Sequence, residues 1–145
     1  QPFDSGNRAG GDAALQRLPN ALGCAAMLVL HTYQKCSTCR EAVRWLRAHG
    51  IPFEEHPIRE EPPSLETLRR ALADMGGQLR ALFNTSGQDY RALGLKDKLP
   101  AMSADEALRL LACNGNLIKR PFARDYKRGI TLAGFKAEAW SAALL

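Results

Sequence analysis

The chain has 145 residues, of which 46% are hydrophobic and 24% are charged, and its formal net charge is +5. This size and balance are typical of a single globular domain, and the chain shows neither an internal repeat nor an apolar run long enough to span a membrane. The basic residues are dispersed along the chain instead of forming a stripe with aromatic residues, which argues against a nucleic-acid-binding face.

Residues 1–26 differ in character from the rest of the chain. Glycine, asparagine and aspartate interrupt any regular period there, and the first methionine is Met27. We expect this segment to be a disordered leader or a tag-derived extension, with the folded domain over residues 27–145. Its last residues are apolar, but no basic region directly precedes a proper signal-peptide core. We therefore expect a cytoplasmic protein, and a monomer.

The first predicted unit is a strand, a helix and a second strand. Residues 28–33 form a short apolar run that predicts a buried strand. Residues 40–49 place apolar side chains on one face and arginines on another, which predicts a helix that Gly50 ends. Residues 51–58 predict a second strand, parallel to the first because a helical crossover joins the two.

The middle third of the chain predicts a block of helices. Residues 64–75, 88–93 and 103–113 have helical spacing of apolar side chains, and residues 78–83 predict a short helical turn. Ser64 is expected to cap the first of these helices, and Ser103 with Glu106 forms a capping box at the start of the last. Cys113, near the end of that last helix, is expected to be a buried structural thiol.

The C-terminal part predicts a hairpin and a final helix. The strands are expected over residues 117–122 and 130–133, with a turn over 126–129, and the helix over 135–143. Together with the first unit this gives an α/β fold: a four-stranded mixed sheet with a helical insertion.

Cys36 and Cys39 form a Cys-x-x-Cys motif, with Ser37 and Thr38 between them, where the first strand gives way to the first helix. This placement is typical of a thioredoxin-type redox site. Unpaired N–H groups and the positive dipole at a helix start favour a thiolate at Cys36, and Arg40 adds positive charge nearby. Cys39, one helical turn further on, can attack and release whatever Cys36 has bound.

The cysteine pair could also serve two structural roles. A structural zinc site usually needs four ligands, but Cys24 and Cys113 stand alone and the three histidines are not spaced as ligands. A structural disulfide between Cys36 and Cys39 would close a very short loop and remove little entropy from the unfolded chain. The redox role is therefore favoured, and no metal is expected.

Arg120 and Pro121 are predicted to face the cysteine loop. Proline at the start of a strand removes a donor from the ladder, and we expect its peptide bond here to be cis. The arginine before it offers a planar fork of donors suited to an oxyanion or a carboxylate, and its charge would stabilise the Cys36 thiolate. An exposed arginine on a strand edge is the alternative. Asn84 lies in a polar, glycine-ended loop that either binds an anion or caps helices.

Three segments in the same order resemble motifs of the glutaredoxin-coupled arsenate reductases and their Spx-type relatives. Residues 33–40, 83–87 and 117–121 read YQKCSTCR, FNTSG and LIKRP. The resemblance runs from Met27 to near the end of the chain. The chain is most similar to the arsenate-reductase-related branch, which shares the Asn-Thr-Ser-Gly loop and the Gly-Phe pair at residues 134–135.

The resemblance implies a thioredoxin-like domain with a helical insertion. It implies that Cys36 is the nucleophile and that Arg120, before a cis-Pro121, binds the anion. The other residues expected to contact a substrate or anion are Ser37, Thr38, Arg40 and Asn84. A small thiol or an oxyanion would be the substrate, with no bound cofactor and with glutathione, glutaredoxin or thioredoxin as the electron donor.

The departures from the family pattern separate two functions. In arsenate reductases proper a serine occupies the place of Cys39, and two further arginines occupy the places of Asn84 and Gly134, so arsenate itself is not the expected substrate. The first function is a thiol–disulfide oxidoreductase in which Cys39 or glutathione resolves the intermediate. The alternative is an Spx-like redox-sensing regulator that binds RNA polymerase. The first ranks higher because it needs only residues already identified.

Overall fold

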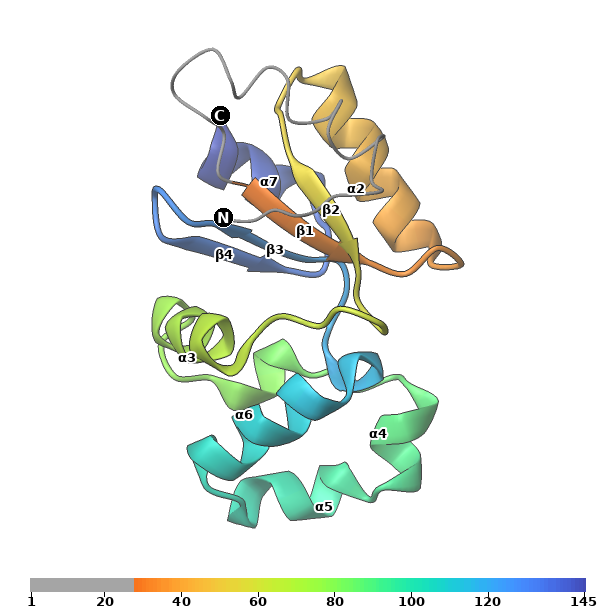
Figure 1. Cartoon of the computed structure of the whole chain (residues 1–145), viewed down its shortest axis with the longest axis vertical. Helices are drawn as coiled ribbons and strands as arrows, with labels where there is room; N and C mark the ends of the chain where they lie inside the picture. Colours follow the sequence, from red (N-terminus) through yellow and green to blue (C-terminus); the bar gives the residue numbers. More distant parts are fainter. Residues whose placement is uncertain (1–27) are drawn as a thin grey trace, which may run out of the picture.

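The computed structural model describes residues 28–145, so the leader expected over residues 1–26 lies outside the described part of the chain. Four strands form one sheet in the order β2-β1-β3-β4 (Figure 1). They are β1 Leu28–Thr32, β2 Glu54–Pro57, β3 Phe122–Asp125 and β4 Ile130–Ala133. β1 pairs in parallel with β2 and antiparallel with β3, which pairs antiparallel with β4. The predicted mixed sheet of four strands is confirmed.

Two helices complete what we call the sheet half of the molecule: the four strands with α2 and α7. Helix α2 spans Ser37–Ala48 and α7 spans Ala137–Leu144. Because side chains alternate along a strand, Leu28 and Leu30 of β1 point to the same face of the sheet. There they pack with the apolar sides of α2 and α7 in one buried cluster that contains Trp140, which is 1% exposed.

The second part of the molecule is the helical block, residues 65–117, which Figure 1 shows below the sheet. Its helices are α3 Leu65–Asp74, α4 Gln88–Ala92, α5 Leu95–Lys98 and α6 Ala104–Cys113, with short 3-10 helices η2 Leu79–Leu82, η3 Leu99–Ala101 and η4 Gly115–Leu117. The predicted caps are confirmed: Ser64 accepts from the Thr67 backbone N–H, and Ser103 and Glu106 form a capping box.

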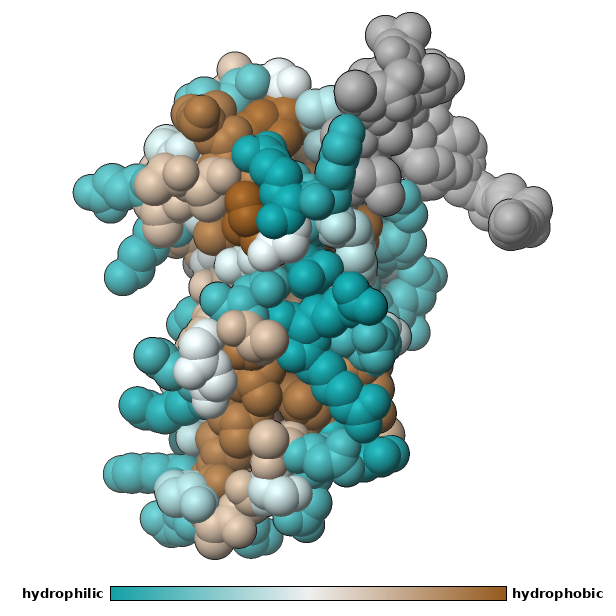
Figure 2. Space-filling model, turned by 90° about the vertical axis from the view of Figure 1, so that its left-hand side faces the viewer, coloured by the Kyte–Doolittle hydropathy of each residue, from teal (hydrophilic) through white to brown (hydrophobic). Residues whose placement is uncertain are grey.

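The helical block has a core of its own, distinct from that of the sheet half. Phe83, Leu111 and Ile118 are fully buried in it, and Phe122 reaches it from β3. Polar contacts also tie the block to the sheet, since Asp74 at the end of α3 accepts from Thr131 at 2.7 Å and pairs with Arg124 at 3.2 Å. Figure 2 shows apolar surface over both parts with a hydrophilic band between them.

Several predicted bounds and environments were wrong. Helix α2 begins at Ser37 instead of residue 40, because the Cys36 side chain itself caps the helix. Residues 117–122 are not a strand: they contain the end of η4 and an extended link, and β3 begins only at Phe122. Ile118 instead makes a single bridge with Phe83 in the helical block. The helices α5, η3 and η4 were not expected.

The predicted environment of Cys113 was also wrong. Its thiol is exposed, because α6 turns Leu108 and Leu111 toward the core and leaves its last residue at the surface. Within residues 28–145, no helix is both long and apolar enough to cross a membrane.

Candidate functional site

The cysteine loop is a tight turn between β1 and α2. The Cys36 N–H donates to the Tyr33 carbonyl at 3.0 Å, and the Cys36 carbonyl accepts from the Arg40 N–H at 3.1 Å. Cys36 is the N-cap of α2, and its Sγ accepts from the backbone N–H of Cys39 at 3.4 Å. A side chain at this position satisfies an otherwise unpaired N–H group of the first helical turn. The sulfur therefore lies where negative charge is favoured.

The pKa of Cys36 is lowered from the ordinary thiol value. Partial burial acts against this shift, but it is outweighed by the backbone and side-chain hydrogen bonds from Cys39, the charge of Arg120 and the backbone N–H of Thr38. Each of these interactions favours the thiolate over the thiol. The predicted position of Cys36 at a helix start is confirmed, and the charge of Arg120 acts on its thiol.

Cys39 has the opposite character. It is 2% exposed, and burial raises its pKa to about 12, with further upward contributions from its hydrogen bond to Cys36 and from the Cys36 charge. Its Sγ accepts from the Tyr33 N–H at 3.5 Å. The pKa values of the two thiols, three residues apart, are thus shifted in opposite directions, and both thiols are free.

Arg120 lies on the extended link between η4 and β3, and its peptide bond to the buried Pro121 is cis, as predicted. Main-chain hydrogen bonds fix this link on both sides: Lys119 N–H donates to the Leu82 carbonyl at 2.8 Å, and Gly134 N–H donates to the Pro121 carbonyl at 2.9 Å. The guanidinium carbon of Arg120 lies 4.7 Å from the centroid of the Tyr33 ring. The structure therefore brings Arg120 to the cysteine loop.

The remaining predicted residues differ in their placement. Thr38 is half-buried in the first turn of α2, and Ser37 beside it is exposed. Arg40 donates from Nη1 to the Gln34 carbonyl at 3.0 Å and so braces the cysteine loop. Asn84 Nδ2 donates to the Asn116 carbonyl at 3.5 Å, and Asn84 lines a cavity that Arg120 also lines.

Two residues at this site were missed by the sequence analysis. Arg59, for which no role was predicted, donates from Nη1 to the Tyr33 hydroxyl at 3.0 Å, and its guanidinium carbon lies 5.0 Å from the same ring centroid. Tyr33, expected only as the end of a strand, therefore contacts both guanidinium groups. The side chains of Tyr33, Arg59 and Arg120 line one cavity of about 290 Å³. Only the position of Tyr33 directly before the cysteine loop could have indicated its role.

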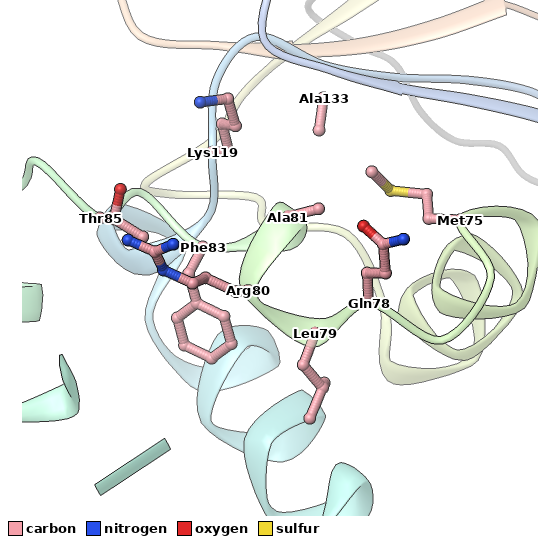
Figure 3. Close-up of a pocket in the computed structure, with 9 residues that line it drawn as sticks. All are labelled: Met75, Gln78, Leu79, Arg80, Ala81, Phe83, Thr85, Lys119 and Ala133. Carbon is pink, nitrogen blue, oxygen red and sulfur yellow. The ribbon is translucent and has the colours of Figure 1, made fainter. Parts of the chain in front are cut away.

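A larger cavity of about 660 Å³ lies apart from the two cysteines (Figure 3). Lys119 and Ala133 line it from the sheet side, and Met75 and Arg80 from the helical block. Lys119 and Arg120 therefore line different cavities, as expected for successive residues of an extended segment. Within residues 28–145, no cluster of three or more His, Cys, Asp or Glu side chains could hold a metal ion.

Comparison with known proteins found one matching family model and several proteins of similar sequence. The ArsC family model matches residues 31–143. YusI of Bacillus subtilis is 47% identical over 111 residues, which cover 77% of this chain and 92% of that protein. The global transcriptional regulator Spx of Enterococcus faecalis is 34% identical over 103 residues, which cover 70% of this chain and 76% of that protein.

Solved structures agree with the sequence relatives. A possible arsenate reductase from Streptococcus mutans has a TM-score of 0.73 and 43% identity, with 80% of this chain and 98% of that chain covered. An ArsC family related protein from Bacteroides fragilis has a TM-score of 0.75 and 36% identity, with 80% and 96% covered. The chain therefore belongs to the ArsC family and has its thioredoxin-like, arsenate-reductase-like fold.

Proposed function

We propose that this protein is a thiol–disulfide oxidoreductase with Cys36 as the nucleophile and Cys39 as the resolving thiol. The observation that carries the proposal is the contrast between the two sulfurs. Cys36 caps a helix, is partly accessible and has a lowered pKa, whereas Cys39 is buried and its pKa is raised to about 12. A nucleophile must be ionised and reachable, and a resolving thiol must be close and protected until it is needed.

The proposed cycle consists of two exchanges. The Cys36 thiolate attacks one sulfur of a small disulfide, so that a bond forms to Cys36, the substrate S–S bond breaks and a thiolate leaves. Cys39 then loses its proton and attacks the Cys36 sulfur, which releases the second substrate thiol and leaves a Cys36–Cys39 disulfide. The substrate gains two electrons and the cysteine pair loses two. Two molecules of a thiol such as glutathione, or the dithiol of glutaredoxin or thioredoxin, restore the pair, and we propose a cytoplasmic setting for this cycle.

Two features support a disulfide over arsenate as the substrate. At Asn84, where the resemblance places an arginine of arsenate reductases, the side chain is an amide that donates to a backbone carbonyl. At Gly134, the place of the other arginine, φ is +78° and a Cβ would lie 2.7 Å from Cε of Lys119. An arginine is disfavoured at that backbone angle. Arg120 is thus left without the two arginines that would complete an arsenate site.

Alkylation across a pH series tests the thiolate. Purified protein is treated with iodoacetamide between pH 5 and pH 9, and the labelled peptides are quantified by mass spectrometry. We expect Cys36 to react faster than the exposed Cys113 at pH 6, because only the thiolate is nucleophilic. Equal rates for the two residues throughout the series would contradict the proposal.

A trapping experiment tests the chemistry itself. In the variant Cys39→Ser the mixed disulfide on Cys36 cannot be resolved internally, so small disulfides should accumulate as adducts on Cys36. The matched control is Cys36→Ser, which should carry no adduct at Cys39 because that thiol is buried and protonated. Adducts at Cys39 alone would reverse the assigned roles.

The second candidate function is a redox-sensing regulator that binds RNA polymerase. The relative from Enterococcus faecalis, 34% identical, is a global transcriptional regulator. In this function the Cys36–Cys39 disulfide would alter a binding surface instead of reducing a substrate. Capture of RNA polymerase subunits from a bacterial extract by immobilised protein, reduced in one arm and oxidised in the other, tests it. Capture in one redox state only would support the regulator, and no capture in either would exclude it.

A further inference from the structure

The Tyr33 ring holds two arginines at the edge of the cysteine site, and only one of them, Arg120, belongs to the anion site discussed above. We propose that Arg59 is a specificity-determining residue that, with Arg120, binds the carboxylate of a small anionic disulfide whose sulfur Cys36 attacks. The inference rests on the proposed oxidoreductase function and names the class of its substrate.

The first step of the argument is geometric. The guanidinium carbons of Arg59 and Arg120 lie 5.0 and 4.7 Å from the centroid of the Tyr33 ring. The distance between the two carbons therefore cannot exceed the sum of these two distances. The hydrogen bond from Arg59 to the Tyr33 hydroxyl, at 3.0 Å, fixes the orientation of the first group. Stacking on an aromatic ring leaves the edges of a guanidinium, where its donors lie, free for another partner. The ring thus preorganises two donor groups beside one cavity.

The second step concerns charge. No carboxylate of residues 28–145 lies within ion-pair distance of Arg59 or Arg120. The one acidic side chain of the cavity, Asp89, accepts from the amides of Asn114 at 3.1 Å and Asn116 at 3.4 Å. The two cations therefore lack an anionic partner within the described chain. A ligand carboxylate would supply it, with bidentate geometry that a guanidinium favours.

The third step connects the cavity to the reacting sulfur. Arg120 lines the cavity, and its charge also lowers the pKa of Cys36, so one residue of the cavity wall acts on the nucleophile. Arg59 lines the same cavity but does not contribute to that lowering. Arg59 is therefore placed to select the substrate without setting the reactivity of the thiol. A disulfide with its carboxylate a few bonds from the sulfur would span the two positions.

The test compares two aliphatic disulfides that differ in charge. Dithiodiglycolate carries carboxylates, and hydroxyethyl disulfide is neutral. The rate of adduct formation on Cys36 is followed by mass spectrometry in the Cys39→Ser background, where no added reductant is needed. We expect Arg59→Gln to lower the ratio of the anionic rate to the neutral rate by about ten-fold, the effect of losing one charge-assisted hydrogen bond.

Two further variants identify the cause of that change. Arg44→Gln removes one exposed charge from α2 outside the cavity and should change the ratio less than two-fold if general attraction is weak. Arg59→Lys keeps the charge but loses the planar fork, and should recover only part of the ratio. An equal fall in Arg44→Gln, or an unchanged ratio in Arg59→Gln, would overturn the inference while leaving the oxidoreductase function intact. Absence of any Cys36 adduct with either disulfide would overturn both.

Discussion

The sheet half and the helical block both bury an apolar cluster, yet they contribute different groups to the shared site. The sheet half carries the two cysteines at the end of α2 that adjoins β1. The links of residues 58–64 and 118–121 join the two parts (Figure 1) and carry Arg59 and Arg120. Asn84 belongs to the helical block, so the residues that line the cavity come from the junction. The surroundings of Cys36 are thus a local feature of one helix start, whereas the cavity wall exists only when the two parts are packed together.

This difference explains how one family can vary its chemistry. The hydrogen bonds that lower the pKa of Cys36 come from residues within three positions of it, and they are formed whenever α2 folds. The cations and amides of the cavity can be exchanged without disturbing that turn, because they are held by other segments. Substitution of Arg59 or Asn84 should therefore leave the hydrogen bonds at Cys36 in place, whereas substitution of Arg120 also removes a charge that lowers the pKa of that thiol.

The junction between the two parts should be the region most sensitive to substitution. Gly115 in η4 is so close to the end of β2 that a Cβ would lie 1.9 Å from the Ile58 carbonyl oxygen. That oxygen belongs to the backbone and cannot turn away, so Gly115→Ala should lower the free energy of unfolding by about 3 kcal/mol in a urea titration. Gly129→Ala, with φ of +68° but open space around it, should lose only about 1 kcal/mol. Equal losses of unfolding free energy in the two variants would show that the backbone at the junction shifts readily to accommodate the added methyl group.

The next largest expected effect is the pH dependence of stability caused by His31, which lies on the face of the sheet that meets the helical block. His31 is 6% exposed beside His56, and burial followed by the His56 charge lowers the His31 pKa from 6.5 to about 4, although Glu61 opposes the shift. The unfolded chain therefore binds this proton more readily than the folded one, so stability is complete above pH 6.5 and is lost as the pH falls toward 4, by roughly 2–3 kcal/mol. Urea titrations at successive pH values measure this loss.

The variant His31→Leu is the control for that pH dependence, because leucine cannot titrate. Its free energy of unfolding should vary much less between pH 6.5 and 4. A slope as steep as that of the unmodified protein would assign the effect to groups other than His31.

The smallest expected effect separates the contributions of Arg120 and Cys39 to the pKa of Cys36. Arg120→Gln should raise the pKa of Cys36, so its alkylation profile should move to higher pH, but the hydrogen bonds from Cys39 act more strongly and should still hold the pKa below the ordinary thiol value. Arg44→Gln also removes one positive charge, in this case from α2, and should leave the alkylation profile of Cys36 unchanged. A larger shift in Arg44→Gln than in Arg120→Gln would show that general charge, and not the junction arginine, acts on the sulfur.

Much of the fold followed from local patterns, and the errors occurred where tertiary contacts decided. Caps such as Ser64 and Ser103 act within one helical turn, and their helices were found where predicted. Residues 117–122 were predicted as a strand from the apolar Leu117, Ile118 and Phe122, but the capping side chain of Asn114 and the close approach of Gly115 to Ile58 turn part of this segment into η4. Apolarity alone does not distinguish a strand from a link that packs on a core.

At the site, the Cys-x-x-Cys turn, the helix start at Cys36 and the arginine before Pro121 could be predicted from the amino-acid sequence, because each depends on neighbours a few residues away. The meeting of Tyr33, Arg59 and Arg120 could not, since these residues lie 26 and more positions apart and come together through the packing of the sheet half on the helical block. The same packing buries Cys39 and leaves Cys113 exposed. Burial is a property of the packed molecule, and no pattern within a single helix fixes it.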